Sequence, residues 1–123
     1  MHVITPDLAR TTTTPNAVVT SLATPALGST ALTSWQVRMR PGAAGPLHTM
    51  DKEQIHVVTA GSLTISIGDR TETVTAGSAL IVPAGAERRV QAGDEGLEAL
   101  VSMPAGGQVT VPGEAPRPLP WAQ

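Results

Sequence analysis

The sequence predicts an all-β fold, namely a sandwich, barrel or jelly roll. Short segments rich in Val, Ile, Leu and Thr follow one another through most of the chain, and turn signals separate them. No stretch has the length and periodicity of a long helix. The 123 residues suffice for one compact domain and are too few for two.

Nine segments are predicted to be strands: residues 17–22, 31–40, 54–59, 62–67, 71–75, 78–82, 87–91, 97–103 and 107–111. The plainest hairpin spans 62–75 and turns at Gly68-Asp69. Ala60-Gly61 and 93–96 are interpreted as further turns. Residues 79–82 are apolar at every position, so this strand is expected to be buried on both faces.

The ends of the sequence differ from its middle. Residues 1–16 are predicted to be an N-terminal arm, 17–111 a β-barrel domain, and 112–123 a Pro-rich tail. Trp121 in that tail is expected to dock against a surface groove.

Composition excludes several classes of function. Cysteine is absent, so the chain has no disulfide, thiolate nucleophile or Cys-ligated metal. A net charge of -2 and the absence of Phe and Tyr argue against nucleic-acid binding. No apolar run is long enough for a membrane span, and the first residues do not resemble a signal peptide, so we expect a cytoplasmic protein.

Two stretches, Gly45–Gly61 and Gly77–Ala92, resemble the two sequence motifs of the cupin superfamily in spacing and turn residues. The matching positions are His48 and Met50 for two histidines, Gln54 for the glutamate, Gly61 for the closing glycine, then Gly77, Pro83 and Gly85, with Arg88 for the last histidine and Ala92 for the asparagine. The leading glycine of the first motif has no clean match. The resemblance implies a cupin-type double-stranded β-helix, which is a jelly-roll barrel. It says less about activity, because three of the four usual metal ligands are replaced.

The alternation of polar and apolar residues and the resemblance to cupins disagree about which side chains of the strand beginning at Gln54 face inward. Alternation alone would bury Ile55 and Val57 and expose Gln54 and His56. The resemblance places the Gln54 position inside the barrel, and we follow it. Ile55 and Val57 then form an exposed apolar surface, which predicts a homodimer.

The cavity mouth is therefore expected to hold a polar cluster in an aliphatic pocket. Its predicted members are His48, Met50, Gln54, His56 and Arg88, with Met39, or Arg38 and Arg40, from an adjacent strand. The guanidinium of Arg88 cannot bind a metal and repels cations, so no tightly bound metal or other cofactor is expected. An inward Arg without an inward carboxylate favours a polar or anionic small molecule as ligand.

Catalysis in such a site would be proton transfer of the isomerase or cyclase type. His48 and His56, with an ordinary imidazole pKa near neutrality, are the candidate general acid or base, and Arg88 would stabilise an oxyanion. Met39, Met50, Gln54 and Arg88 are the predicted ligand-binding residues.

Three alternatives remain open. One is a metal-dependent cupin oxygenase or isomerase with His48, Gln54 and His56 as ligands. Another is a non-catalytic small-molecule sensor. The third is a filled barrel in which Arg88 pairs with Glu53, Glu87 or a chain-end carboxylate, and His48 and His56 are core histidines.

Overall fold

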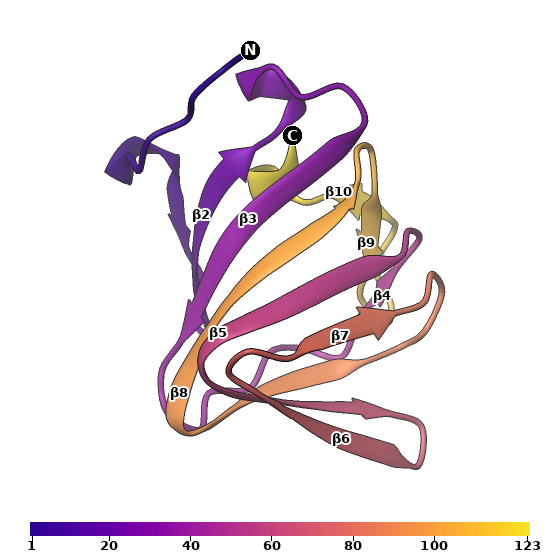
Figure 1. Ribbon diagram of the computed structural model, residues 1–123. Helices are drawn as coiled ribbons and strands as arrows, with labels where there is room; N and C mark the ends of the chain where they lie inside the picture. The colour runs from indigo at the N-terminus through magenta and orange to yellow at the C-terminus, as the bar shows by residue number, and fades with distance from the viewer.

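Two antiparallel β-sheets form the fold that the computed structural model gives to residues 1–123 (Figure 1). The larger sheet has seven strands in the order β1-β2-β3-β8-β5-β6, and β7 pairs with β5 beside this path. The smaller sheet has the order β10-β9-β4. The predicted all-β jelly-roll fold is confirmed.

The strands are β1 (Thr11–Thr13), β2 (Val18–Ala23), β3 (Leu32–Met39), β4 (Thr49–Met50), β5 (Gln54–Ile67), β6 (Arg70–Thr75), β7 (Ala79–Val82), β8 (Arg89–Pro104), β9 (Gln108–Thr110) and β10 (Arg117–Pro118). Three 3-10 helices connect or end them: η1 (Leu8–Arg10), η2 (Pro25–Leu27) and η3 (Pro120–Ala122). None of these helices has the length and apolar character needed to cross a membrane.

The two longest strands, β5 and β8, each join two segments that the sequence predicted as separate strands. The predicted turns at Ala60-Gly61 and 93–96 are wrong, because both lie inside these strands. The register between β5 and β8 slips there, and a Cβ on Gly61, whose φ is 68°, would collide with the carbonyl oxygen of Gly96. Such irregularities bend a strand, and Figure 1 shows both strands turning at this point.

The interior contains two apolar clusters. The first consists of Met39, Val58, Leu63, Ile65, Val74, Val82, Ala92, Leu97 and Ala99. The second consists of Val19, Trp35, Met50, Val101, Met103, Val109, Leu119 and Ala122, and Trp121 packs against it. The strands β3 and β8 therefore contribute to both an aliphatic cluster and a second cluster with both tryptophans of the sequence, whereas β5 contributes only to the first.

The two ends of the sequence take part in the fold. Thr11–Thr13 forms strand β1 and pairs with β2. At the other end, the hydroxyl of Ser21 donates to the carbonyl oxygen of Trp121 at 2.7 Å, and that of Thr33 donates to the carbonyl oxygen of Ala122 at 3.0 Å. These bonds anchor the last residues to β2 and β3, and the half-buried Trp121 lies at the wall of the barrel cavity and not in a separate surface groove.

Strand β7 was predicted to be buried on both faces, and this prediction is wrong. Val82 is fully buried, whereas Ala79 and Ile81 are exposed and Ile81 is 64% exposed. β7 pairs with β5 only, and nothing in the chain covers its outer face. Within this one chain, the apolar run of β7 is thus covered on one face only.

Candidate functional site

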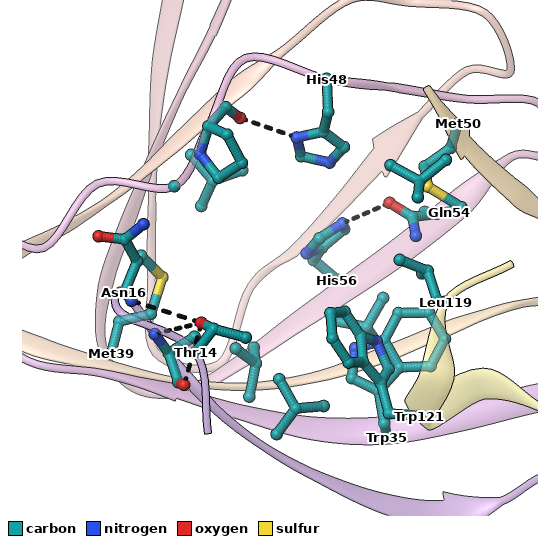
Figure 2. A pocket seen from close by; sticks show the side chains of 18 of the residues that line it. Thr14, Asn16, Trp35, Met39, His48, Met50, Gln54, His56, Leu119 and Trp121 are labelled. Carbon is teal, nitrogen blue, oxygen red and sulfur yellow. Dashed lines mark hydrogen bonds between the residues drawn. The ribbon is translucent and has the colours of Figure 1, made fainter. Parts of the chain in front are cut away.

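The barrel encloses a cavity of about 430 Å³ whose wall is mainly apolar (Figure 2). Fourteen of its 23 lining residues are hydrophobic, and none is Asp or Glu. Five of the six predicted site residues line it, namely His48, His56, Met50, Gln54 and Met39. Arg88 does not.

Strand β5 brings two of these residues into the interior. Gln54 and His56 are 4% and 9% exposed, whereas the intervening Ile55 and the next residue Val57 are 40% and 38% exposed. The prediction that Gln54 and His56 face inward is therefore confirmed. His48 approaches from a loop whose backbone exchanges two hydrogen bonds with Arg88, of 2.9 and 2.8 Å.

Arg88 lies behind Gln54 and not at the cavity surface. Its side chain is fully buried; Nη2 donates to Gln54 Oε1 at 3.3 Å and Nη1 donates to the carbonyl oxygen of Ala86 at 2.8 Å. None of the three salt bridges in the protein involves Arg88, so the alternative in which Arg88 pairs with Glu53, Glu87 or a chain-end carboxylate is wrong. Two neutral oxygens thus accept hydrogen bonds from the guanidinium of Arg88, but no carboxylate balances its positive charge.

The hydrogen bonds of the two histidines assign their tautomers. His48 Nδ1 lies 2.9 Å from the carbonyl oxygen of Pro46, which only accepts, so Nδ1 carries the proton and Nε2 keeps a free lone pair. His56 Nε2 lies 3.4 Å from Gln54 Oε1, so Nε2 carries the proton there (Figure 2). His56 Nδ1 then carries no proton and can only accept a hydrogen bond, and this buried atom has no partner. The buried donor Trp121 Nε1 also has no hydrogen-bond partner.

Both imidazoles are held in the neutral form. Burial lowers the pKa of His56 to about 4, and the charge of Arg88 and the neighbouring His48 contribute to this shift. Burial also lowers the pKa of His48, with a smaller contribution from Arg88, although the bond to Pro46 opposes the shift. The sequence-based expectation that His48 and His56 titrate near neutrality is therefore wrong. Burial beside the fixed positive charge of Arg88 disfavours the imidazolium form of both side chains. Arg88 has a pKa lowered by burial to about 10 and remains charged.

The donor set does not fit the divalent metal that the cupin motifs imply. No three residues of the types His, Cys, Asp and Glu gather at a point suited to a metal ion. The amide oxygen of Gln54 already accepts from Arg88 and His56, and an unpaired guanidinium 3.3 Å from that oxygen would repel a cation. Hard divalent ions also prefer carboxylates, and the cavity has none.

The sequence offered Met39, or Arg38 and Arg40, as further members of the site. Only Met39 lines the cavity. Arg38 points to the outer face, where its Nε lies 3.3 Å from Glu98 Oε1. Arg40 is exposed and does not line the cavity. Strand alternation explains the difference, because neighbours of an inward Met39 must face outward.

Sequence reasoning missed several lining residues at the two ends of the chain: Thr14, Pro15, Asn16, Arg117, Leu119 and Trp121. Strand pairing places Met50, Val109 and Arg117 opposite one another across the smaller sheet. Arg117 lies in a two-residue strand among prolines, where no periodicity predicts pairing. No local signal could have identified it.

Comparison with known proteins gives a family match and a structural match. Residues 35–103 match the family model described as Cupin domain. None of the curated protein sequences matches the chain. Solved structures of Bacillus subtilis oxalate decarboxylase share the fold, and one of these structures concerns the Mn(II) centers of that enzyme.

Two examples give the extent of this likeness. A Trp-to-Phe variant of the enzyme has a TM-score of 0.72 and 22% identity, over 85% of this chain and 30% of that one. An Arg-to-Ala variant has a TM-score of 0.70 and 24% identity, over 76% of this chain and 26% of that one. This chain thus spans less than a third of the enzyme's length, and identities below 25% indicate the fold alone.

Proposed function

The chain belongs to the cupin family, and from that premise we propose that its barrel binds a small organic molecule without a tightly bound metal ion. The ligand has an apolar body and a polar end that meets His48, Gln54 and His56. The observation that carries this proposal is the cavity of about 430 Å³, whose size and apolar wall with a few convergent polar groups are typical of ligand sites.

The polar end of the cavity supports a ligand that donates a hydrogen bond. His48 is neutral and only partly buried, and its Nε2 lone pair is free to accept from a hydroxyl or N–H group. Met39 and Met50 line the wall, and their flexible thioether side chains adapt to the shape of an apolar body. In this proposal Arg88 acts through Gln54, whose amide it orients, and through its unpaired positive charge.

A second candidate function is proton transfer at the same site. A neutral imidazole with a bare nitrogen is a general base, and the carbonyl of Pro46 holds the His48 ring in the required tautomer. The positive charge of Arg88 would stabilise negative charge that develops on the ligand after His48 takes a proton. A molecule that is bound and returned unchanged would instead indicate a sensor.

We also propose that the protein forms a homodimer through the outer apolar patch, defined as Ile55, Val57, Ile81 and Leu100. Ile55 pairs with Ile81, and Val57 pairs with Leu100, so the four residues lie on three adjacent strands. All four are exposed. A contiguous apolar area on a sheet face is typical of a self-association surface.

Tryptophan fluorescence tests the binding proposal directly, because both tryptophans of the sequence line the cavity. We expect phenylnaphthylamine, a neutral apolar amine, to quench this fluorescence saturably at one site per chain. Ala17→Phe should weaken binding, since Ala17 lines the cavity, whereas Val18→Phe on the exposed side of β2 should not. Equal binding by the two variants, or no saturable binding by the wild type, would contradict the proposal.

A further inference from the structure

We propose that Arg117 selects ligands carrying an anionic group, so that the molecule bound in the barrel is an amphipathic organic anion such as a carboxylate on an apolar body. This inference rests on the proposed binding function and names its ligand class. The anionic group lies at Arg117, the apolar body lies along the cavity wall, and a hydrogen-bond donor reaches His48.

The position of Arg117 follows from strand pairing. Arg117 is directly opposite Val109, which is opposite Met50. Side chains of directly paired residues project from the same face of a sheet, so Arg117 shares the face of two buried residues that line the cavity. Arg117 itself is exposed, which places its guanidinium at the solvent side of the cavity.

The segment that carries Arg117 is held in place on both sides. Its own strand pairs with β9, and the residues after it are fixed by the hydrogen bonds from Ser21 and Thr33 to the carbonyl oxygens of Trp121 and Ala122. Leu119 and Trp121 of the same segment line the cavity. A charged group and an apolar wall are therefore presented by one anchored stretch of chain.

The charges around the cavity favour an anion. Among the 23 lining residues Arg117 is the one with a formal charge at neutral pH, because no acidic residue lines the cavity and both histidines there are neutral. None of the salt bridges of the protein involves Arg117. Arg88 adds a second unpaired positive charge from behind Gln54. A cleft with charges of one sign and low-dielectric walls concentrates ligands of the opposite sign.

A guanidinium and an apolar wall together specify an amphipathic molecule. Guanidinium groups bind carboxylates with two parallel hydrogen bonds, and water still reaches this one, so the charge need not be desolvated before binding. The indoles of Trp35 and Trp121 offer flat apolar surface in the same cavity. A small inorganic anion would use the guanidinium and leave this wall uncovered.

Two dyes that differ by one charged group test the inference. Phenylnaphthylamine and its sulfonated analogue anilinonaphthalene sulfonate share the same aromatic body and N–H donor. We expect the wild type to bind the sulfonate about fivefold more tightly than the neutral amine, the size of effect given by a solvent-exposed ion pair, and this preference should weaken with salt. Arg117→Gln should remove most of the preference, so that the variant binds the two dyes with nearly equal affinity. Arg40→Gln, which removes an exposed Arg outside the cavity, should change neither affinity.

The outcomes separate this inference from the proposed function. If both dyes bind with equal affinity and Arg117→Gln changes neither, the binding function stands and the role of Arg117 is refuted. If the preference for the sulfonate survives in Arg117→Gln and disappears in Arg88→Met, the anion is held at Arg88 and the inference is wrong. If neither dye binds the wild type, the proposed function and this inference fail together.

Discussion

At the start of strand β5, over residues 54–57, the two faces have the reverse of the usual polarity. The inner face presents the amide of Gln54 and the imidazole of His56, whereas the outer face presents the aliphatic side chains of Ile55 and Val57 to solvent. Both faces belong to four consecutive residues, so the difference cannot come from local chain propensity.

What distinguishes the faces is the set of partners that each one meets. Gln54 accepts from Arg88 and His56 and donates to Met103 Sδ at 3.7 Å. These contacts offset the cost of burying polar groups. Ile55 and Val57 have apolar neighbours on the adjacent strands and no covering layer. Each exception to the usual pattern thus points to a partner: a ligand on the inner face and a second chain on the outer face.

The largest effect is expected when the inner polar contacts are broken. Arg88→Ala should lower the free energy of unfolding by about 3 kcal/mol, because it removes a fully buried side chain and leaves Gln54 Oε1 and the Ala86 carbonyl short of a donor. The matched control Arg89→Ala changes an exposed neighbour and should have little effect. Urea denaturation measures both. Similar values for the two variants would show that the inner contacts contribute little to stability.

A smaller effect is expected from pH. The pKa of His56 is about 4 in the folded protein and 6.5 for an unperturbed imidazole, so below pH 6.5 the unfolded chain binds more protons. The free energy of unfolding should therefore fall by about 2 kcal/mol between about pH 7.5 and about pH 5 because of His56 alone. His56→Gln should flatten this dependence, whereas His2→Gln, at an exposed histidine, should not. Identical slopes for wild type and His56→Gln would refute the assigned cause.

The smallest free-energy change is expected on the outer face. Replacing Ile55 and Ile81 together by Thr should raise the dimer dissociation constant at least about tenfold, since it removes apolar area from the outer patch. Unfolding of the monomer should change little. Val18→Thr, at an exposed apolar position outside the patch, is the control. Sedimentation velocity at several concentrations measures the effect, and a wild type that is monomeric throughout would contradict the dimer.

The general fold could be predicted from the sequence, and the bends of its long strands could not. Segment spacing and turn residues predicted most strands closely, including the hairpin that turns at Gly68-Asp69. Ala60-Gly61 and 93–96 were misinterpreted because glycine is favoured equally in a turn and at a register slip within a strand. Which of the two occurs depends on the partner strand, and a single segment does not reveal it.

The site could be predicted only in part, for a similar reason. The resemblance to cupins placed Gln54 and His56 in the interior, against simple alternation, and placed Arg88 at the cavity mouth. It could not show that the guanidinium of Arg88 lies behind Gln54 and does not reach the cavity, because that position depends on the lengths and hydrogen bonds of the Arg88 and Gln54 side chains. Arg117 was missed because its pairing with Val109 joins distant segments. The neutral state of the histidines depends on burial, which the sequence does not specify.

The most direct test of the central claim is a nitrogen-15 spectrum of the imidazoles, recorded at about pH 7 with zinc and then with anilinonaphthalene sulfonate. The claim is that the polar cluster of the inner face binds an organic molecule and not a metal ion. We predict neutral rings with the proton on Nδ1 of His48 and on Nε2 of His56, no change of either with zinc, and a shift of His48 Nε2 with the sulfonate. Exposed His2 serves as the internal reference. Stoichiometric zinc-induced shifts of both His48 and His56, with no response to the sulfonate, would contradict the claim and identify the two residues as metal ligands.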